Sequence, residues 1–258
     1  MKHTAAWWEN VDPAGAYNLL NAVADTQITW ALTNIQIPSL NQIVLLAGGA
    51  DNTAAPIMRL VAPSLRTRSL FQIAPLNAQA AAAIEPDTPP KILDLRTTPL
   101  VMVPGENAQV ELNSNPVAAQ SQWLIAWFAD GPVAPVGGSI FTVRAVGATA
   151  LVAGAWTNCP LVFDENLPRG RYQIVGMKAI SATGIAARLV VPDSRWRPGV
   201  LACDVVEDED WPGFRYGAFG AFGEFEDTDA LTADFLANAA DAAEIVYLDL
   251  IQLRSGPG

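Results

Sequence analysis

The residues of this chain that could do chemistry are mostly carboxylates, and they crowd into one region. The densest run is Glu207-Asp208-Glu209-Asp210, which follows Asp204 and leads into Trp211. Carboxylates in a turn can bind calcium. However, the run lacks the Asp-x-Asp-x-Asp-Gly pattern with a distal Glu that an EF-hand requires. The sequence predicts a solvated acidic loop without a metal site, and calcium binding by this loop stays open as an alternative.

A second carboxylate pair, Glu224 and Glu226, has the spacing of a glycosidase pair. Residues two apart share one face of a strand, and retaining or inverting glycosidases need two carboxylates facing one sugar. The Glu-x-Asp-x-x-Glu pattern of sandwich-fold glycosidases is not matched here. The favoured interpretation is therefore surface charge, and catalysis by this pair remains a minor alternative.

Other reactive side chains are scarce. The chain of 258 residues has one histidine, His3, and two cysteines, Cys159 and Cys203. General acid–base, nucleophilic and transition-metal chemistry depend on such groups. The sequence therefore predicts a protein that is not an enzyme, with no catalytic residue and no cofactor, and two buried thiols.

The net charge of −11 is a regional property. Residues 204–249 contain thirteen carboxylates and a single base, Arg215, whereas the other residues are nearly neutral. No basic arm of the kind that packages nucleic acid precedes Arg59, so direct nucleic-acid binding is not expected. Arginine suits pairing with carboxylates across interfaces. We therefore expect neighbouring copies to meet acid to base, with the interface formed by Arg188, Arg195, Arg197, Glu207, Asp208, Glu209, Asp210 and Trp211.

Composition also favours assembly. Hydrophobic residues make up 51% of the chain and charged residues only 16%, against about 25% charged in an average soluble domain. A monomer of this composition would expose much neutral or apolar surface. Burial of that surface against other subunits is the expected solution.

The elements that must position these residues are mostly β-strands. Segments of five to ten residues, several of them apolar on both faces, are separated by Gly, Pro, Asn and Asp clusters, which is typical of an antiparallel sandwich. The predicted strands are 27–37, 42–47, 57–61, 69–74, 91–96, 100–103, 108–113, 122–128, 139–146, 150–156, 171–180, 184–191, 199–206 and 244–253.

Helical signals are few. Asp12-Pro13 predicts the start of a short helix over 13–24, alanine-rich 75–84 predicts one or two helical turns, and 228–243 predicts a surface helix or a long loop. The predicted organisation is an N-terminal extension with a short helix over 1–26, followed by a single β-sandwich domain over 27–258.

Eight tryptophans offer a different function. Exposed aromatic rings can stack on sugars. Trp30, Trp123, Trp127 and Trp156 lie in predicted strands and are expected in the core, whereas Trp7, Trp8, Trp196 and Trp211 lie in irregular segments and are expected at the surface. A carbohydrate-binding sandwich module is therefore the alternative function.

The second half of the chain resembles a known family in its order of turns and strands. Leu167–Gly176 leads into Ala179–Thr183 and Ala186–Val190, then comes Arg195-Trp196-Arg197-Pro198-Gly199, the acidic loop, a glycine–aromatic segment and the closing strand at Tyr247–Leu250. This order resembles single jelly-roll major coat proteins of tailless icosahedral viruses. The likeness covers about 165–253.

The resemblance implies a self-assembling coat subunit that packs laterally into a virion shell, and it brings no catalytic residues. The implied partners are copies of the chain itself, a second coat subunit and an internal membrane. Localisation in the virion after synthesis in the host cytoplasm is expected, because no signal peptide is visible. The chain is judged too short for two jelly rolls in tandem, given about 100–150 residues for a usual domain.

Overall fold

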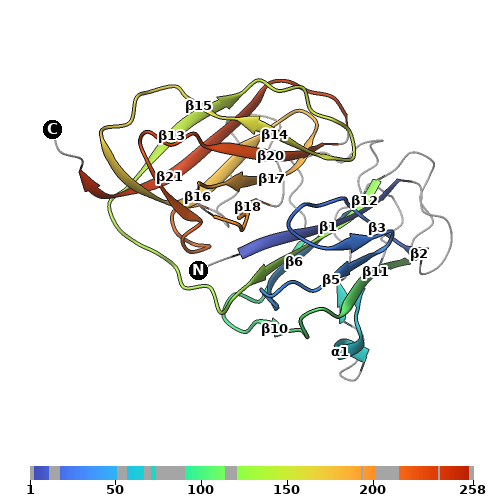
Figure 1. Cartoon of the computed structure of the whole chain (residues 1–258). Helices are drawn as coiled ribbons and strands as arrows, with labels where there is room; N and C mark the ends of the chain where they lie inside the picture. Colours follow the sequence, from blue (N-terminus) through green and yellow to red (C-terminus); the bar gives the residue numbers. More distant parts are fainter. Residues whose placement is uncertain are drawn as a thin grey trace. The chain divides into compact units, whose positions relative to one another are not determined.

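The structure is a computed structural model, and it describes residues 3–11, 18–50, 57–66, 71–73, 91–113, 121–192, 194–200, 215–237 and 239–255 (Figure 1). Nearly every element is a β-strand, and the paired strands of the described residues run antiparallel. The predicted all-β, antiparallel sandwich class is therefore confirmed. The one helix in the described residues is α1, the single turn Pro63–Arg66.

The chain divides into two compact units instead of the single predicted domain. Thr4–Pro132 form the N-terminal unit, and Val133–Gly258 are the body of the C-terminal unit. Each span is shorter than 130 residues. A complete sandwich fits into this length because several strands are only two to four residues long.

The C-terminal unit contains two sheets. Their orders are β15-β13-β21-β16-β19 and β14-β20-β17-β18. The strands are β13 (Ile140–Gly147), β14 (Trp156–Pro160), β15 (Val162–Phe163), β16 (Gly170–Ile180), β17 (Gly184–Val190), β18 (Gly199–Val200), β19 (Gly223–Glu226), β20 (Thr232–Ala237) and β21 (Glu244–Ser255).

Strand order identifies the topology of this unit. With the two-residue edge strand β15 left aside, the other eight strands can be counted in chain order. One sheet then reads first, eighth, third, sixth and the other reads second, seventh, fourth, fifth. Two four-stranded antiparallel sheets connected in this way form a jelly roll.

The N-terminal unit has the same order with interrupted strands. Its sheets are β10-β6-β12-β1-β3, with β9 also on β6, and β4-β5-β11-β7-β8, with β2 also on β11. The strands are β1 (His3–Val11), β2 (Asn18–Leu19), β3 (Asn21–Ala22), β4 (Trp30–Ala31), β5 (Asn34–Gln36), β6 (Gln42–Ala50), β7 (Ile57–Val61), β8 (Phe71–Ile73), β9 (Lys91–Asp94), β10 (Leu100–Val101), β11 (Asn107–Asn113) and β12 (Ser121–Ala129).

Two positions of this second jelly roll are each filled by two short strands. β2 and β5 pair with opposite ends of β11 and share the second position. β9 and β10 pair with successive parts of β6 and share the sixth. One sheet then reads β1, β12, β6, β9/β10 and the other β2/β5, β11, β7, β8, so the jelly-roll order occurs in both units.

Three local predictions are wrong. The predicted helix over 13–24 gives way, in its described part, to β2 and β3, because Leu20 and Ala22 are buried at a spacing of two. The predicted strand 27–37 is the hairpin β4–β5. The segment 228–243, predicted as a surface helix or a long loop, contains the strand β20, in which every residue from Ala233 to Ala237 is buried.

Other differences are smaller. The predicted strand 150–156 starts six residues later, as β14, and the extension over 1–26 contributes strands to both sheets of the N-terminal unit. Strands β1, β15 and β19 have no predicted counterpart. The helical turns predicted at 75–84 lie outside the described residues.

The two-sided apolar strands have different explanations. In β12 every residue from Trp123 to Ala129 is buried. In β21 one face is buried, and part of the other is covered by the segment 215–222. Arg215 Nε (2.8 Å) and the amide of Tyr216 (2.9 Å) both donate to the carboxylate of Asp249 in β21. Cover from within the chain thus explains part of the apolar outer face of this sheet.

Candidate functional site

The predicted interface arginines do not form one surface. Arg188 lies in β17 and is 1% exposed, whereas Arg197 is partly exposed and Arg195 is exposed. The acidic partners proposed for them, Glu207–Trp211, lie outside the described residues. Of the predicted site, the structure therefore places only the three arginines.

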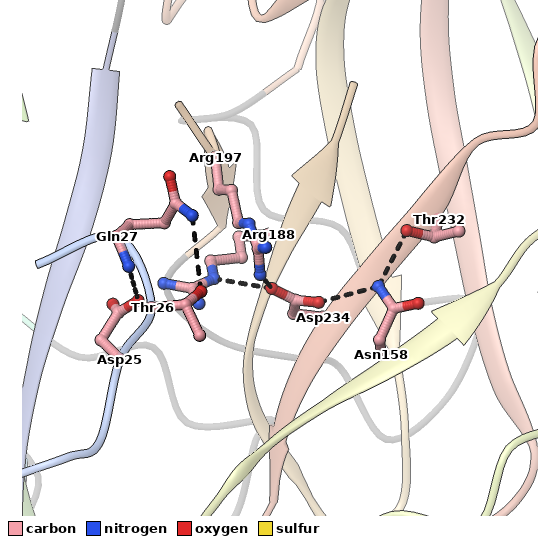
Figure 2. Close-up of polar contacts among 8 residues, drawn as sticks. All are labelled: Asp25, Thr26, Gln27, Asn158, Arg188, Arg197, Thr232 and Asp234. Atoms are coloured by element: carbon pink, nitrogen blue, oxygen red, sulfur yellow. Dashed lines mark hydrogen bonds and ion pairs between the residues drawn. The ribbon is translucent and has the colours of Figure 1, made fainter. Parts of the chain in front are cut away.

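Arg188 and Arg197 are both held by one carboxylate (Figure 2). Strand pairing sets Asn158, Asp234 and Arg188 side by side across β14, β20 and β17. Arg188 Nε lies 3.1 Å from Asp234 Oδ2, Arg197 forms an ion pair with the same oxygen, and Asn158 Nδ2 donates to Asp234 Oδ1 (2.9 Å). The guanidinium of Arg188 also lies 4.1 Å from the centre of the Trp156 ring. Because Asp234 is buried too, the opposite charges compensate each other inside the unit, and removal of Asp234 would leave buried positive charge uncompensated by it.

Arg195 behaves differently. Its guanidinium lies over the ring of Trp196, at 4.5 Å from the ring centre, and within the described residues it makes no ion pair. A cation stacked on an aromatic ring keeps its planar fork of donors available. Arg195 is thus the arginine of the predicted set that remains able to meet an external carboxylate.

A buried ion pair that the sequence analysis did not propose ties the 215–222 segment to β21. Asp249 is fully buried and accepts from Arg215 Nε (2.8 Å), Arg215 Nη2 (3.0 Å), Thr142 Oγ1 (2.7 Å) and the amide of Tyr216 (2.9 Å). Four hydrogen bonds replace the water that this carboxylate loses on burial. Two features of the sequence could have indicated this pair: Arg215 is the single base of the acidic region, and Asp249 lies between two leucines of an apolar strand.

The carboxylates Glu224 and Glu226 form ion pairs with Arg171 and Arg254, and these four residues are called the charge ladder below. Glu224 and Glu226 flank buried Phe225 on the edge strand β19. Arg171 Nη2 lies 2.8 Å from Glu224 Oε2, and Arg254 Nη2 lies 3.1 Å from Glu226 Oε1. Both carboxylates are thus paired with arginines of the same sheet, from β16 and β21, which favours the surface-charge interpretation over a pair of catalytic acids.

An open pocket of about 600 Å³ lies beside the charge ladder. Arg169, Asp227 and Arg254 line it together with Ser255, and Asp227 Oδ1 accepts from the amide of Gly170 (2.8 Å). Glu226 lines it as well, so the charges of two arginines and two carboxylates balance at the pocket.

Glu244 is the most unusual carboxyl of the C-terminal unit. It is fully buried at the start of β21, its Oε1 has no hydrogen-bond partner, and its Oε2 lies 3.9 Å from the Sγ of buried Cys159. Burial raises the pKa of Glu244, and the negative charge of Asp241 adds to this. Burial also raises the pKa of the Cys159 thiol. The prediction of a buried thiol is confirmed for Cys159, whereas Cys203 lies outside the described residues.

The tryptophans are placed differently from the prediction. Trp123 and Trp127 are buried, as predicted, and Trp156 is half-buried. Trp8 and Trp196 are buried although they were expected at the surface, because Trp8 belongs to β1 and Trp196 packs under Arg195. Trp30, expected in the core, is 42% exposed in the hairpin β4–β5. The side chains of Trp7 and Trp211 are not described.

Within the described ranges, no three His, Cys, Asp or Glu side chains gather closely enough to hold a metal ion. The same part of the chain contains no helix of the length and apolar character that a membrane crossing needs. The acidic loop considered for calcium lies outside these ranges.

Comparison with known proteins gives matches in structure alone. No family model matches the chain, and no curated protein is similar to it in sequence. Among solved structures, the chain is similar to the major capsid protein of bacteriophage PM2, with a TM-score of 0.28 and 13% identity over 98% of this chain and 100% of that one. It is also similar to a chain of Sulfolobus turreted icosahedral virus, with a TM-score of 0.26 and 10% identity over 98% and 92%.

A third similar structure is a Paenibacillus xanthan lyase, with a TM-score of 0.27 and 7% identity over 94% of this chain and 23% of the enzyme. The fold assignment rests on the strand order of the two units. At the level of the fold, the predicted resemblance to jelly-roll coat proteins is confirmed, with two jelly rolls in place of one.

Proposed function

We propose that this chain is a structural coat subunit that assembles with copies of itself into a virion shell. The observation that carries the proposal is the repeated strand order: the same jelly roll occurs twice in one chain. Jelly rolls build viral shells as well as lectins and cupins. A subunit with two units of one fold offers similar edges to several neighbours, which suits the many weak contacts of a closed lattice.

The arrangement of charge supports a structural role over catalysis. Glu224 and Glu226 are paired with arginines, and Asp249 and Asp234 hold buried guanidinium groups. A glycosidase needs one protonated acid and one free carboxylate facing the same sugar. The carboxylates described here instead stabilise sheet edges and anchor a covering segment.

We further propose that Arg195 is the arginine through which one copy meets the acidic run 207–210 of its neighbour. Arg188 and Arg197 are engaged by Asp234, whereas Arg195 is exposed. An arginine–carboxylate pair between copies would be weak alone and would orient the contact as much as strengthen it.

Sedimentation velocity of the full chain over a range of concentrations tests this proposal. Wild type should form large, discrete species above a threshold concentration, and Arg195→Glu should raise that threshold. The double variant Arg195→Glu with Glu209→Arg should restore it, whereas the control Arg169→Glu, at another exposed turn, should not change it. If Arg195→Glu assembles like wild type, the pairing is wrong.

A carbohydrate-binding module is the second candidate, and the exposed ring of Trp30 is the observation that favours it. It predicts that a sugar ligand changes tryptophan fluorescence in wild type and leaves that of Trp30→Phe unchanged. It also predicts a monomer at all concentrations.

A further inference from the structure

Two residues of the described chain have a backbone conformation that glycine normally provides. Among the described non-glycine residues, Leu32 (φ 53°) and Tyr216 (φ 56°) have positive φ. For a side chain with a Cβ this conformation is strained, and a large residue keeps it only when the surroundings impose it. The two residues differ in what their side chains gain from it.

Leu32 occupies a turn position that favours glycine. Leu32 and Thr33 are the two loop residues of the hairpin β4–β5, whose last paired residues are Ala31 and Asn34. Positive φ at the first loop residue alone is the pattern of a type II′ turn, which normally has glycine there. The sequence thus places a leucine where the hairpin itself would be better served by glycine.

The conformation is imposed by contacts that do not involve the leucine side chain. The carbonyl of Leu32 accepts from the amide of Ala22 (2.7 Å), and Gln109 Nε2 donates to Thr33 Oγ1 (3.3 Å). The amide of Gln36 donates to the carbonyl of Thr29 (2.8 Å) across the hairpin. All three hydrogen bonds would be kept by a glycine at position 32.

The side chain contributes almost nothing to folding. Leu32 is 82% exposed, so it buries little apolar area to offset the strain. Tyr216 provides the comparison: it is 57% exposed, but its ring lies 4.7 Å from the guanidinium of Arg215, and its amide binds Asp249. Tyr216 is therefore used within the chain, whereas the leucine side chain remains largely exposed to solvent.

We propose that Leu32, together with the neighbouring exposed ring of Trp30, is a contact site for a second copy of this chain. This inference rests on the proposed coat function and names one of its contact residues. An exposed leucine and tryptophan at a rigid turn form an apolar anchor of the kind that fills a pocket on a partner.

The size of the anchor favours a repeated contact between copies. One leucine and one half-exposed tryptophan bury far less than the ~1,200 Å² of a specific, stable pair. Such a contact becomes effective only when many identical ones act together, as in a lattice of identical subunits. The chain itself exposes apolar side chains that could receive the anchor, including Val101 and Val103 of the N-terminal unit and Val162 of the C-terminal unit.

Charge disfavours a lipid surface or a nucleic acid as the occupant. No lysine or arginine occurs between His3 and Met58, and Asp25 is the charged residue nearest the hairpin in sequence. Anionic headgroups and phosphates attract clusters of basic side chains. A neutral apolar tip therefore fits a protein copy better than either.

The test is Leu32→Gly, for which the proposal predicts a more stable fold and weaker assembly. Relief of strain should raise the thermal midpoint of the unassembled chain by about 2–4 °C. Loss of a leucine that becomes buried between copies should raise the threshold concentration for assembly about tenfold or more. A side chain needed for folding would instead lower the thermal midpoint.

Two further variants complete the design. Leu32→Asn keeps a residue that tolerates positive φ and removes the apolar contact, so it should reproduce the assembly defect even if the glycine variant folds poorly. Val152→Thr removes an exposed apolar group of the C-terminal unit at nearly constant shape and should assemble like wild type.

Three outcomes would overturn the inference. If both Leu32 variants assemble at the wild-type threshold, the contact is wrong and the coat function stands. If wild type floats with phosphatidylcholine vesicles and Leu32→Asn does not, the occupant is lipid and a second copy is not the partner. If wild type never assembles, the proposed function and the inference both fail.

Discussion

Replacement of Asp249 by alanine should destabilise the C-terminal unit far more than the loss of an exposed ion pair does. Asp249 is fully buried and receives four hydrogen bonds, two of them from Arg215, whose side chain is 7% exposed. Without the carboxylate, the buried guanidinium of Arg215 loses this counter-ion. Breaking a buried pair in this way costs about 3–5 kcal/mol.

The loss expected for Asp249→Ala can be compared with the total free energy of unfolding. A domain of this size has a free energy of unfolding of about 5–15 kcal/mol, so the variant should lose about three tenths to one half of a mid-range value of about 10 kcal/mol. Because Tyr216 also donates to Asp249, the segment 215–222 should detach from the sheet before the unit unfolds. Faster proteolysis within this segment should accompany the loss of stability.

Urea denaturation followed by tryptophan fluorescence measures the effect, and Asp164→Ala is the matched control. Asp164 pairs with Arg144 at 2.6 Å in the same unit, but both side chains are substantially exposed, so its loss should change the free energy of unfolding by about 0–1 kcal/mol. Equal effects of Asp249→Ala and Asp164→Ala would refute the reasoning from burial.

Three further outcomes are expected. The first concerns Glu244: burial raises its pKa above the ordinary 4.5, so the unfolded state ionises first and stability falls as pH rises from about 4.5 through the folded-state pKa. Glu244→Gln should therefore be more stable than wild type at neutral pH, with a gain that disappears toward pH 4. Thermal unfolding measured against pH tests this, with Glu165→Gln, at an exposed position, as the control. If the thermal midpoint of Glu244→Gln depended on pH as that of wild type does, the reasoning would be wrong. Second, Asp234→Ala should cost about 3–5 kcal/mol because buried Arg188 loses the carboxylate of Asp234, whereas Arg171→Ala, whose ion pairs with Glu224 and Glu226 are exposed, should cost under about 1 kcal/mol in the same urea assay. Third, the Cys159 thiol should react with a thiol reagent only after unfolding, because it is fully buried and its pKa is raised. Rapid reaction of Cys159 in the native chain would contradict this.

Much of the strand pattern could be predicted from the sequence. The segments predicted at 42–47, 108–113, 171–180 and 244–253 match β6, β11, β16 and β21 because turn residues bound apolar runs there. The segment 228–243 was mistaken for a helix because both faces of β20 are buried from Ala233 to Ala237. Period two and period 3.6 cannot be separated in a short segment that is buried on both sides.

The two-unit organisation was beyond the reach of local patterns. Two positions of the first jelly roll are each divided between short strands, β2 with β5 and β9 with β10. Strands of two or three residues carry almost no periodic signal. Their place is set by pairing with β11 and β6, which are far away in the sequence.

The site residues show the same limit. Charge patterning drew attention to the arginines, yet it could not separate Arg188, which is paired inside the unit, from exposed Arg195. Which guanidinium is free depends on the register that sets Asp234 beside Arg188. Likewise, the exposure of Trp30 follows from the hairpin at Leu32, which the alternating pattern of 27–37 concealed.

Negative-stain electron microscopy of the full chain, expressed alone and concentrated stepwise with light scattering, tests the central claim most directly. The coat function predicts closed shells, tubes or regular clusters of subunits that appear above a threshold concentration. Particles that stay the size of one chain at every concentration and ionic strength would contradict it.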